Sequence, residues 1–425
     1  MNSIHANFLP ENHYWLRDVP KEDFYLYLEI EGVQPQVSNK RVPLNLALVI
    51  DRSGSMHGVK IDYAKKAMQF VVKNLGPEDC ISLVQYDDEI DVLSPSAQVK
   101  NKEELIRKIE SVFACDMTNL SGGMLEGYRQ VGSTQASGAV NRVLLLSDGL
   151  ANLGITDPAA LQKIAQEKFR NEGIALSTFG VGADFDELLM TSMSEYGGGN
   201  YYFIDSAEKI PAIFARELDG LLAVVAQGST LEVHCPDGFT CEKVFGYPYE
   251  AIHQGVRVRF NDVFATEKKA VLIKMRAAGP PNSDFTFRAH LSYFDAIASG
   301  GLVQEQQEIR VRLVSDNELM KSGVEHQVAE QRAVFIAGEL MEAAAKCTEG
   351  GNPEKGTELL KQAIALIELQ LVNTPQSTVL QKLLSRISSQ ISFHQDYFSY
   401  TLEERQLVTK TTRSEAYLFK RKMEE

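Results

Sequence analysis

The segment DRSGSM, which begins at Asp51, places one carboxylate and two hydroxyls at alternating positions of a short loop. Asp51 ends the apolar run LNLALVID, and Gly54 allows the chain to turn between Ser53 and Ser55. Carboxylate and hydroxyl oxygens are hard ligands of the kind that Mg²⁺ prefers. The loop is therefore a candidate cation site at the end of a buried strand.

Two later segments supply further oxygen donors. Thr118 stands in CDMTNLSGGM just before a predicted helix, and Asp148 ends the strand-like run RVLLLSD. Each fragment by itself would be explained as well by turn capping and local hydrogen bonds. Together, each at the junction of a predicted strand or helix, they favour metal binding. The predicted metal ligands are Asp51, Ser53, Ser55, Thr118 and Asp148, with Mg²⁺ as the ion and Mn²⁺ or Ca²⁺ as alternatives.

The same residues carry a resemblance to a known family. Their pattern, DxSxS followed by Thr and then Asp, resembles the metal-ion-dependent adhesion site of von Willebrand factor A domains, with no position missing. The SDGxxNxG turn at 147–154 and GGGNYYF at 197–203 add to the resemblance, which covers about residues 43–226. The family therefore implies a domain that binds protein partners.

The resemblance also implies how such a site operates. Ser53, Ser55 and Thr118 are implied as direct metal ligands, with Asp51 and Asp148 bound directly or through water. Two carboxylates roughly neutralise Mg²⁺, so a carboxylate from a protein partner can take an open position on the metal. Such a contact, desolvated at the centre of an interface, would be a binding hot spot.

Strand and helix signals alternate through residues 43–226, as in a doubly wound, mostly parallel α/β sheet. Strands are expected at 44–51, 80–87, 90–93, 142–149, 175–182 and 200–205, and helices after Gly58 and near 102–111, 122–131, 157–169 and 207–226. The turns after Asp51 and Asp148 would then lie at carboxyl ends of strands, where open α/β sheets usually bind ligands.

The remaining chain divides into β-rich and helical parts. Residues 227–316 alternate in β-branched and aromatic residues, which predicts an antiparallel β-sandwich. FYLYLEIEG, within the segment 1–42, is expected to pair with those strands, so that the α/β domain is an insertion. Residues 317–425 are predicted to be helical, with three apolar helix faces between 333 and 391. This layout resembles bacterial family members and inter-alpha-inhibitor heavy chains.

Bulk properties narrow the function classes. The net charge of −14 argues against a broad nucleic-acid surface, and five cysteines do not form a disulfide framework. The longest apolar runs fall far short of the ~20 residues of a membrane span. The N-terminal residues show no secretory signal, so a cytoplasmic protein is expected. An exported protein from which the signal had been removed would show the same sequence.

The sequence therefore predicts an interaction module and no enzyme. A rival hypothesis is an accessory or regulatory subunit of a metal-dependent enzyme or ATPase complex, for which His57 is the plausible general base. A third hypothesis is that the metal only stabilises the loops. Three weaker candidates are better explained by structural roles. Cys235 and Cys241 could bind zinc or pair, and the acidic run at 87–91 could be a second cation site, but a structural role is favoured for both. Asp184 and Asp186 are expected to cap a helix.

Overall fold

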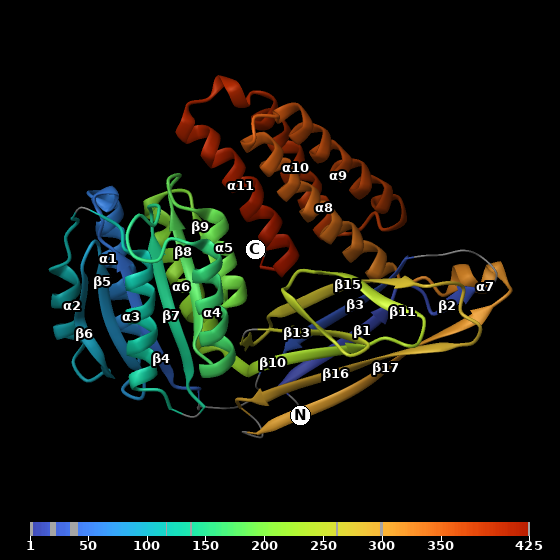
Figure 1. Ribbon diagram of the computed structural model, residues 1–425, viewed down its shortest axis with the longest axis horizontal. Coiled ribbons are helices and arrows are strands. Elements are labelled where there is room, and N and C mark those ends of the chain that lie inside the picture. Colours follow the sequence, from blue (N-terminus) through green and yellow to red (C-terminus); the bar gives the residue numbers. More distant parts are fainter. Residues whose placement is uncertain are drawn as a thin grey trace. The chain divides into compact units, whose positions relative to one another are not determined.

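The computed structural model describes residues 3–17, 23–34, 41–115, 117–136, 138–260, 262–297 and 301–423. Its elements divide between two compact units (Figure 1). One unit is essentially Gln34–Gly228, and the other combines the segments that precede and follow it in the chain. The strands outside the α/β unit and the C-terminal helices belong to this second unit.

The α/β unit is built on a six-stranded sheet (Figure 1). Its strands, in spatial order, are β6 (Ile90–Gln98), β5 (Cys80–Tyr86), β4 (Leu44–Asp51), β7 (Val140–Ser147), β8 (Ala175–Val181) and β9 (Gly198–Ile204). All neighbouring pairs are parallel except β5 with β6. Every residue of β4 and β7 is buried, as expected for near-continuous apolar strands at the centre of such a sheet.

Helices cover both faces of this sheet. They are α1 (Val59–Asn74), α2 (Lys102–Glu110), α3 (Leu120–Ser133), α4 (Pro158–Glu172), α5 (Glu187–Tyr196) and α6 (Ile210–Leu222). Leu48 of β4 lines a small cavity with Met68 of α1 and Phe214 of α6. A Cβ on Gly127 of α3 would lie 2.7 Å from Val49, the next residue of β4. Because successive strand side chains point to opposite faces, the predicted doubly wound architecture is confirmed.

Three elements differ from the sequence expectation. The helix expected at 207–226 ends at Leu222, and Val224 begins β10 (Val224–His234), whose β-branched residues favour a strand. β6 continues to Gln98 although it contains Pro95, because it is an edge strand of the sheet. The sequence indicates α5 only through the expected helix start at Asp184 or Asp186 and gives no range for it.

Two sheets form the β part of the second unit. The four-stranded sheet has the order β1 (Ile4–Pro10), β3 (Asp23–Gly32), β15 (Lys268–Ala277) and β11 (Phe239–Phe245). The larger sheet has the order β12 (Tyr249–Ile252), β13 (Gly255–Arg259), β10, β16 (Phe285–Asp295), β17 (Leu302–Val314) and β2 (Tyr14–Leu16), with β14 (Val263–Phe264) also paired to β10. Antiparallel pairing joins β1 with β3, β3 with β15, β15 with β11, β10 with β13, β13 with β12 and β16 with β17, whereas β17 and β2 are parallel. FYLYLEIEG is therefore a strand, β3, that pairs with β15.

Aromatic side chains join the two sheets. Phe24 of β3 stacks on Phe287 of β16 with ring centroids 5.8 Å apart, and Trp15 of β2 lies edge-on to Phe239 of β11 at 5.8 Å. Aromatic pairs of this kind add about 0.5–1.5 kcal/mol beyond their buried area. The two sheets thus share one aromatic core.

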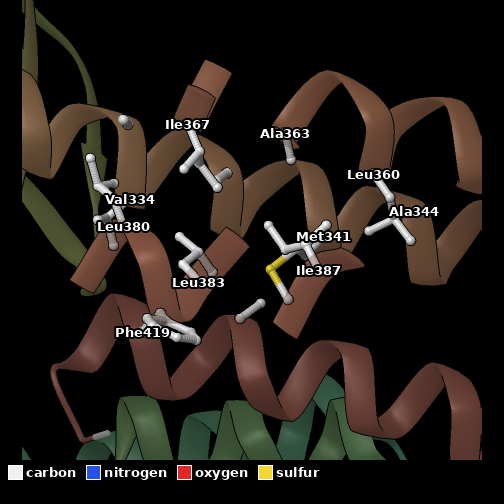
Figure 2. Close-up of a cluster of buried hydrophobic side chains, with 13 residues drawn as sticks. Val334, Met341, Ala344, Leu360, Ala363, Ile367, Leu380, Leu383, Ile387 and Phe419 are labelled. Carbon is white, nitrogen blue, oxygen red and sulfur yellow. The ribbon is translucent and has the colours of Figure 1, made fainter. Parts of the chain in front are cut away.

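The C-terminal helices enclose an apolar core of their own (Figure 2). They are α8 (His326–Glu349), α9 (Pro353–Asn373), α10 (Thr378–Gln395) and α11 (Leu402–Arg421). The short helix α7 (Asn317–Ser322), which precedes them, has no buried residue. Met341 of α8, Ile367 of α9 and Leu383 of α10 are fully buried in this core. The three predicted helical faces are confirmed, and α11 adds Ala416 and Phe419 to them.

A buried histidine links α8, α10 and α11. His394 lies between the hydroxyls of Thr348, 2.7 Å from Nδ1, and Thr412, 3.0 Å from Nε2. The Thr412 hydroxyl donates to the Val408 carbonyl, so Nε2 donates to Thr412, and in the neutral ring Nδ1 accepts from Thr348. Burial lowers the pKa of this ring from 6.5 to about 4, so the ring is neutral near pH 7.

Acid is expected to destabilise the helical part through this histidine. As the pH falls below 6.5, the unfolded chain gains a proton that the folded chain takes up only near pH 4. The free energy of unfolding should fall across this window by about 3 kcal/mol. Urea unfolding of the wild type and His394→Asn at several pH values measures the slope, and equal slopes in both proteins would contradict this assignment.

Across the part of the chain that the structure describes, no helix combines the length and the hydropathy that crossing a membrane requires.

Candidate metal centre

Asp51 is the last residue of β4 and is completely buried. Its Oδ1 accepts a hydrogen bond from the Ser53 backbone N–H at 2.8 Å. Its Oδ2 accepts a hydrogen bond at 2.7 Å from the hydroxyl of Ser147, the last residue of the neighbouring strand β7. Both carboxylate oxygens are thus fixed at the carboxyl ends of two central parallel strands.

A continuous row of oxygens leads from this loop to Asp148. The Ser53 and Ser55 hydroxyls are 3.1 Å apart, and the Ser55 hydroxyl donates to Asp148 Oδ1 at 2.6 Å. Asp148 is completely buried, like Asp51, whereas Ser55 is exposed. Ser55 therefore lies between the buried Asp148 carboxylate and solvent, whereas Ser53 is itself buried.

Thr118 approaches the same oxygens from the loop before α3. Its backbone N–H donates to the Asn152 side chain at 3.1 Å, and its carbonyl accepts from the Asn152 backbone at 3.2 Å. A Cβ on Gly149 would lie 3.4 Å from the Thr118 hydroxyl and 3.5 Å from that of Ser55. The fold thus brings all five residues singled out in the sequence to one edge of the sheet.

Lys60, in the first turn of α1, is a member of this cluster that the sequence analysis missed. Its Nζ donates to Asp148 Oδ2 at 2.6 Å, so the two oxygens of Asp148 bind Ser55 and Lys60 separately. The lysine side chain is about a quarter exposed. Lys60 therefore neutralises one of the two buried carboxylates.

Burial dominates the electrostatics of Asp51. Removal from water raises its pKa from 3.8 to about 6, against hydrogen bonds from Ser53 and Ser147 that lower it. The nearby charge of Asp148 raises the pKa further. The ionised form of Asp51 is thus destabilised in the metal-free protein, and a cation beside it would favour that form.

The donor set fits a hard divalent cation. Two buried carboxylates, compensated by a single ammonium group, leave unbalanced negative charge beneath three hydroxyls. Among the described residues, no group of three or more His, Cys, Asp or Glu could hold a metal ion, so binding here would depend on hydroxyl ligands. Ser53, Ser55 and Thr118 would hold the ion, with Asp51 and Asp148 beneath them.

The other sequence candidates have structural explanations. In the acidic run, Asp87 pairs with Arg52 at 2.8 Å, and Asp91 accepts from Gln85 at 2.9 Å. Asp186 caps α5 by accepting from Leu189 at 3.0 Å, which confirms the capping interpretation for Asp186 rather than Asp184.

Cys235 and Cys241 are free thiols. The Cys235 sulfur lies 3.7 Å from that of Met275, and burial raises the pKa of Cys235 to about 11. A desolvated, protonated thiol is a packing group, consistent with the structural interpretation of this pair.

A doubly wound α/β sheet with a DxSxS loop, a threonine and an aspartate gathered at its carboxyl edge defines a class of binding domain. Residues 45–216 match the model of that class, the von Willebrand factor type A domain, and this chain contains such a domain. VWA domains generally mediate protein–protein interactions and often bind a divalent metal at this edge.

Relatives embed the domain in longer chains. The uncharacterized protein YfbK of Escherichia coli (strain K12) is 29% identical over 238 residues, covering 55% of this chain and 41% of that protein. The human inter-alpha-trypsin inhibitor heavy chain H4 is 25% identical over 251 residues, covering 56% and 25%. The match thus spans less than half the length of either curated relative.

A solved structure, a von Willebrand factor type A protein from Catenulispora acidiphila, shares the fold at 16% identity. Its TM-score is 0.73, with 90% of this chain and 89% of that chain covered. The likeness therefore extends beyond the α/β unit to the flanking elements.

Proposed function

We propose that this chain binds a protein partner through a Mg²⁺ ion held by Ser53, Ser55 and Thr118 above Asp51 and Asp148. The bound ion would supply an electrophilic position that a carboxylate oxygen of the partner can occupy. The row from the Ser53 hydroxyl through Ser55 to Asp148 is the observation that carries this proposal.

Each chain residue has a distinct role in the proposed site. Ser147 and the Ser53 backbone hold the Asp51 carboxylate in place, so that it need not reorganise when a cation binds. Asn152 fixes the Thr118 loop through two hydrogen bonds. Such support of ligands by neighbouring groups is typical of built metal sites.

We further propose that the site binds without catalysing a reaction. His57, the plausible general base in the sequence, lies exposed at the end of the short 3-10 turn Gly54–Met56. A general base must be held within hydrogen-bond reach of its substrate, and an exposed ring at a loop end is poorly suited to that.

Partner capture tests the proposed function. The full chain, Asp51→Asn, and the control Asp205→Asn are used as baits in native lysate, each with Mg²⁺ and with EDTA. Asp205 is an exposed residue paired with Lys209 at 2.8 Å, outside the site. A partner should be retained by the wild type and Asp205→Asn in Mg²⁺ alone. Recovery of the same proteins under all conditions would contradict the proposal.

A further inference from the structure

Exposed apolar side chains gather on the segments that carry the candidate metal centre. Within the described residues of the α/β unit, eight large hydrophobic side chains are exposed. Six of them lie in the three segments that carry the site: five on the loops before α3 and after β7, and one at the first residue of α1. We call these six the apolar collar, and they are between 36% and 63% exposed: Val59, Phe113, Met117, Leu150, Leu153 and Ile155. Concentrated exposed apolar surface marks interaction sites, whereas scattered residues do not.

The collar residues are next to residues of the site in two of the three segments. Met117 precedes Thr118, and Val59 precedes Lys60. The Phe113 ring lies against the Arg52 guanidinium, 5.8 Å from its centroid, and Arg52 is the neighbour of Asp51. Movement of these apolar side chains is thus tied to the loops that carry the site.

The third loop is held in the same way. Leu150 follows Gly149, the position that lies beside the Thr118 and Ser55 hydroxyls. The backbone N–H of Ile155 donates to the Ser121 hydroxyl at 2.8 Å, which anchors the loop to α3. Exposed apolar groups on anchored loops lose little conformational freedom when a partner covers them.

Charge at the centre of the collar selects an anion. A divalent cation would balance Asp51 and Asp148, which leaves the ammonium of Lys60 as excess positive charge beside the metal. The chain as a whole carries −14, so this point would be a local exception on an acidic protein. The surface therefore combines an anion-binding centre with an apolar surround.

From these observations, and resting on the proposed function, we infer that the occupant is a protein segment that presents one carboxylate flanked by bulky apolar side chains. The carboxylate would meet the metal and Lys60, and the flanking side chains would be covered by the collar. An apolar surround also excludes water from the central polar contact and so strengthens it. A partner carboxylate flanked by polar side chains would leave the apolar collar exposed to water.

A displayed library of random 12-residue peptides tests this inference on the full chain. Phages bound in Mg²⁺ are released with EDTA, and the released peptides should be enriched in Asp or Glu with Leu, Ile, Met or Phe within two positions. Binding of an enriched synthetic peptide should fall at least tenfold in Phe113→Ser and in Leu150→Ser. The control Leu125→Ser, an exposed apolar residue of α3 outside the collar, should bind as the wild type does.

The outcomes separate this inference from the proposed function. Acidic peptides without apolar neighbours would overturn the inference and leave carboxylate capture intact. Apolar peptides that remain bound in EDTA would also overturn it, because the collar would then act without the metal. An EDTA eluate with no enriched sequence would count against both.

Discussion

Asn in place of Asp51 is expected to abolish Mg²⁺ binding and, in the same protein, to raise the melting temperature measured in EDTA. The first effect follows from loss of one of the two carboxylates that would balance the ion. The second follows because Asp51 is a fully buried acid whose pKa lies near 6 instead of 3.8. Asparagine retains an oxygen for the Ser53 N–H and introduces no charge.

The pH dependence gives this prediction its sign. Because the folded-state pKa of Asp51 lies above the unfolded value, protonated Asp51 adds to the free energy of unfolding at low pH. This contribution is lost as the pH rises through about 6. The metal-free wild type should therefore lose about 3 kcal/mol between pH 4 and neutral pH that Asp51→Asn does not lose. Thermal unfolding of both proteins in EDTA at pH 4.5 and pH 7.5 measures this difference. The melting temperature of Asp51→Asn should exceed that of the wild type by more at pH 7.5 than at pH 4.5.

Calorimetric titration of chelator-stripped protein supplies the metal arm of the same experiment. Wild type and Asp205→Asn should bind one Mg²⁺, and Asp51→Asn should show no binding heat. A variant that still binds Mg²⁺, or that melts lower than the wild type in EDTA at pH 7.5, would refute this account of Asp51.

Replacement of Lys60 by methionine is expected to tighten Mg²⁺ binding by roughly tenfold or more. Lys60 Nζ contacts Asp148 at 2.6 Å, so any cation that enters must share that carboxylate with an ammonium group. Repulsion between unit charges 4 Å apart amounts to about 4 kcal/mol near a protein surface, and the divalent ion is repelled more strongly. Methionine keeps the length of the side chain without the charge.

A matched control lies on the same helix. Lys73 is exposed in the last turn of α1, about 20 Å along the helix axis from Lys60, so Lys73→Met changes the net charge equally at a distance. Its Mg²⁺ affinity should stay within twofold of the wild type. Weaker binding in Lys60→Met would show instead that the lysine positions Asp148 for the ion.

The central sheet was predictable because its signals are strong and local. LNLALVID and RVLLLS are almost wholly apolar, and both are entirely buried strands. The inward face of α11 was not identified, although residues 317–425 were expected to be helical, and the reason is the opposite one. Several of its buried residues are polar, among them Thr409, Lys410 and Thr412, so its inward face carries no apolar stripe. Tertiary hydrogen bonds such as that from His394 to Thr412 place it, and a local pattern cannot show them.

The candidate site was predictable to the extent that its residues stand in a spaced motif. Asp51, Ser53 and Ser55 share one loop, and the ends of parallel strands bring Asp148 beside them. Lys60 had no such signal. Its partner lies 88 positions away, and the first turn of a helix does not reveal which neighbouring strand its side chains will reach.

The most direct test of the central claim is a crystal structure of the full chain grown with MnCl₂, with anomalous scattering recorded at the manganese absorption edge. We expect one strong anomalous peak beside the hydroxyls of Ser53, Ser55 and Thr118. No peak at this edge of the sheet, with Lys60 still bound to Asp148, would contradict a metal-dependent adhesion site in this protein.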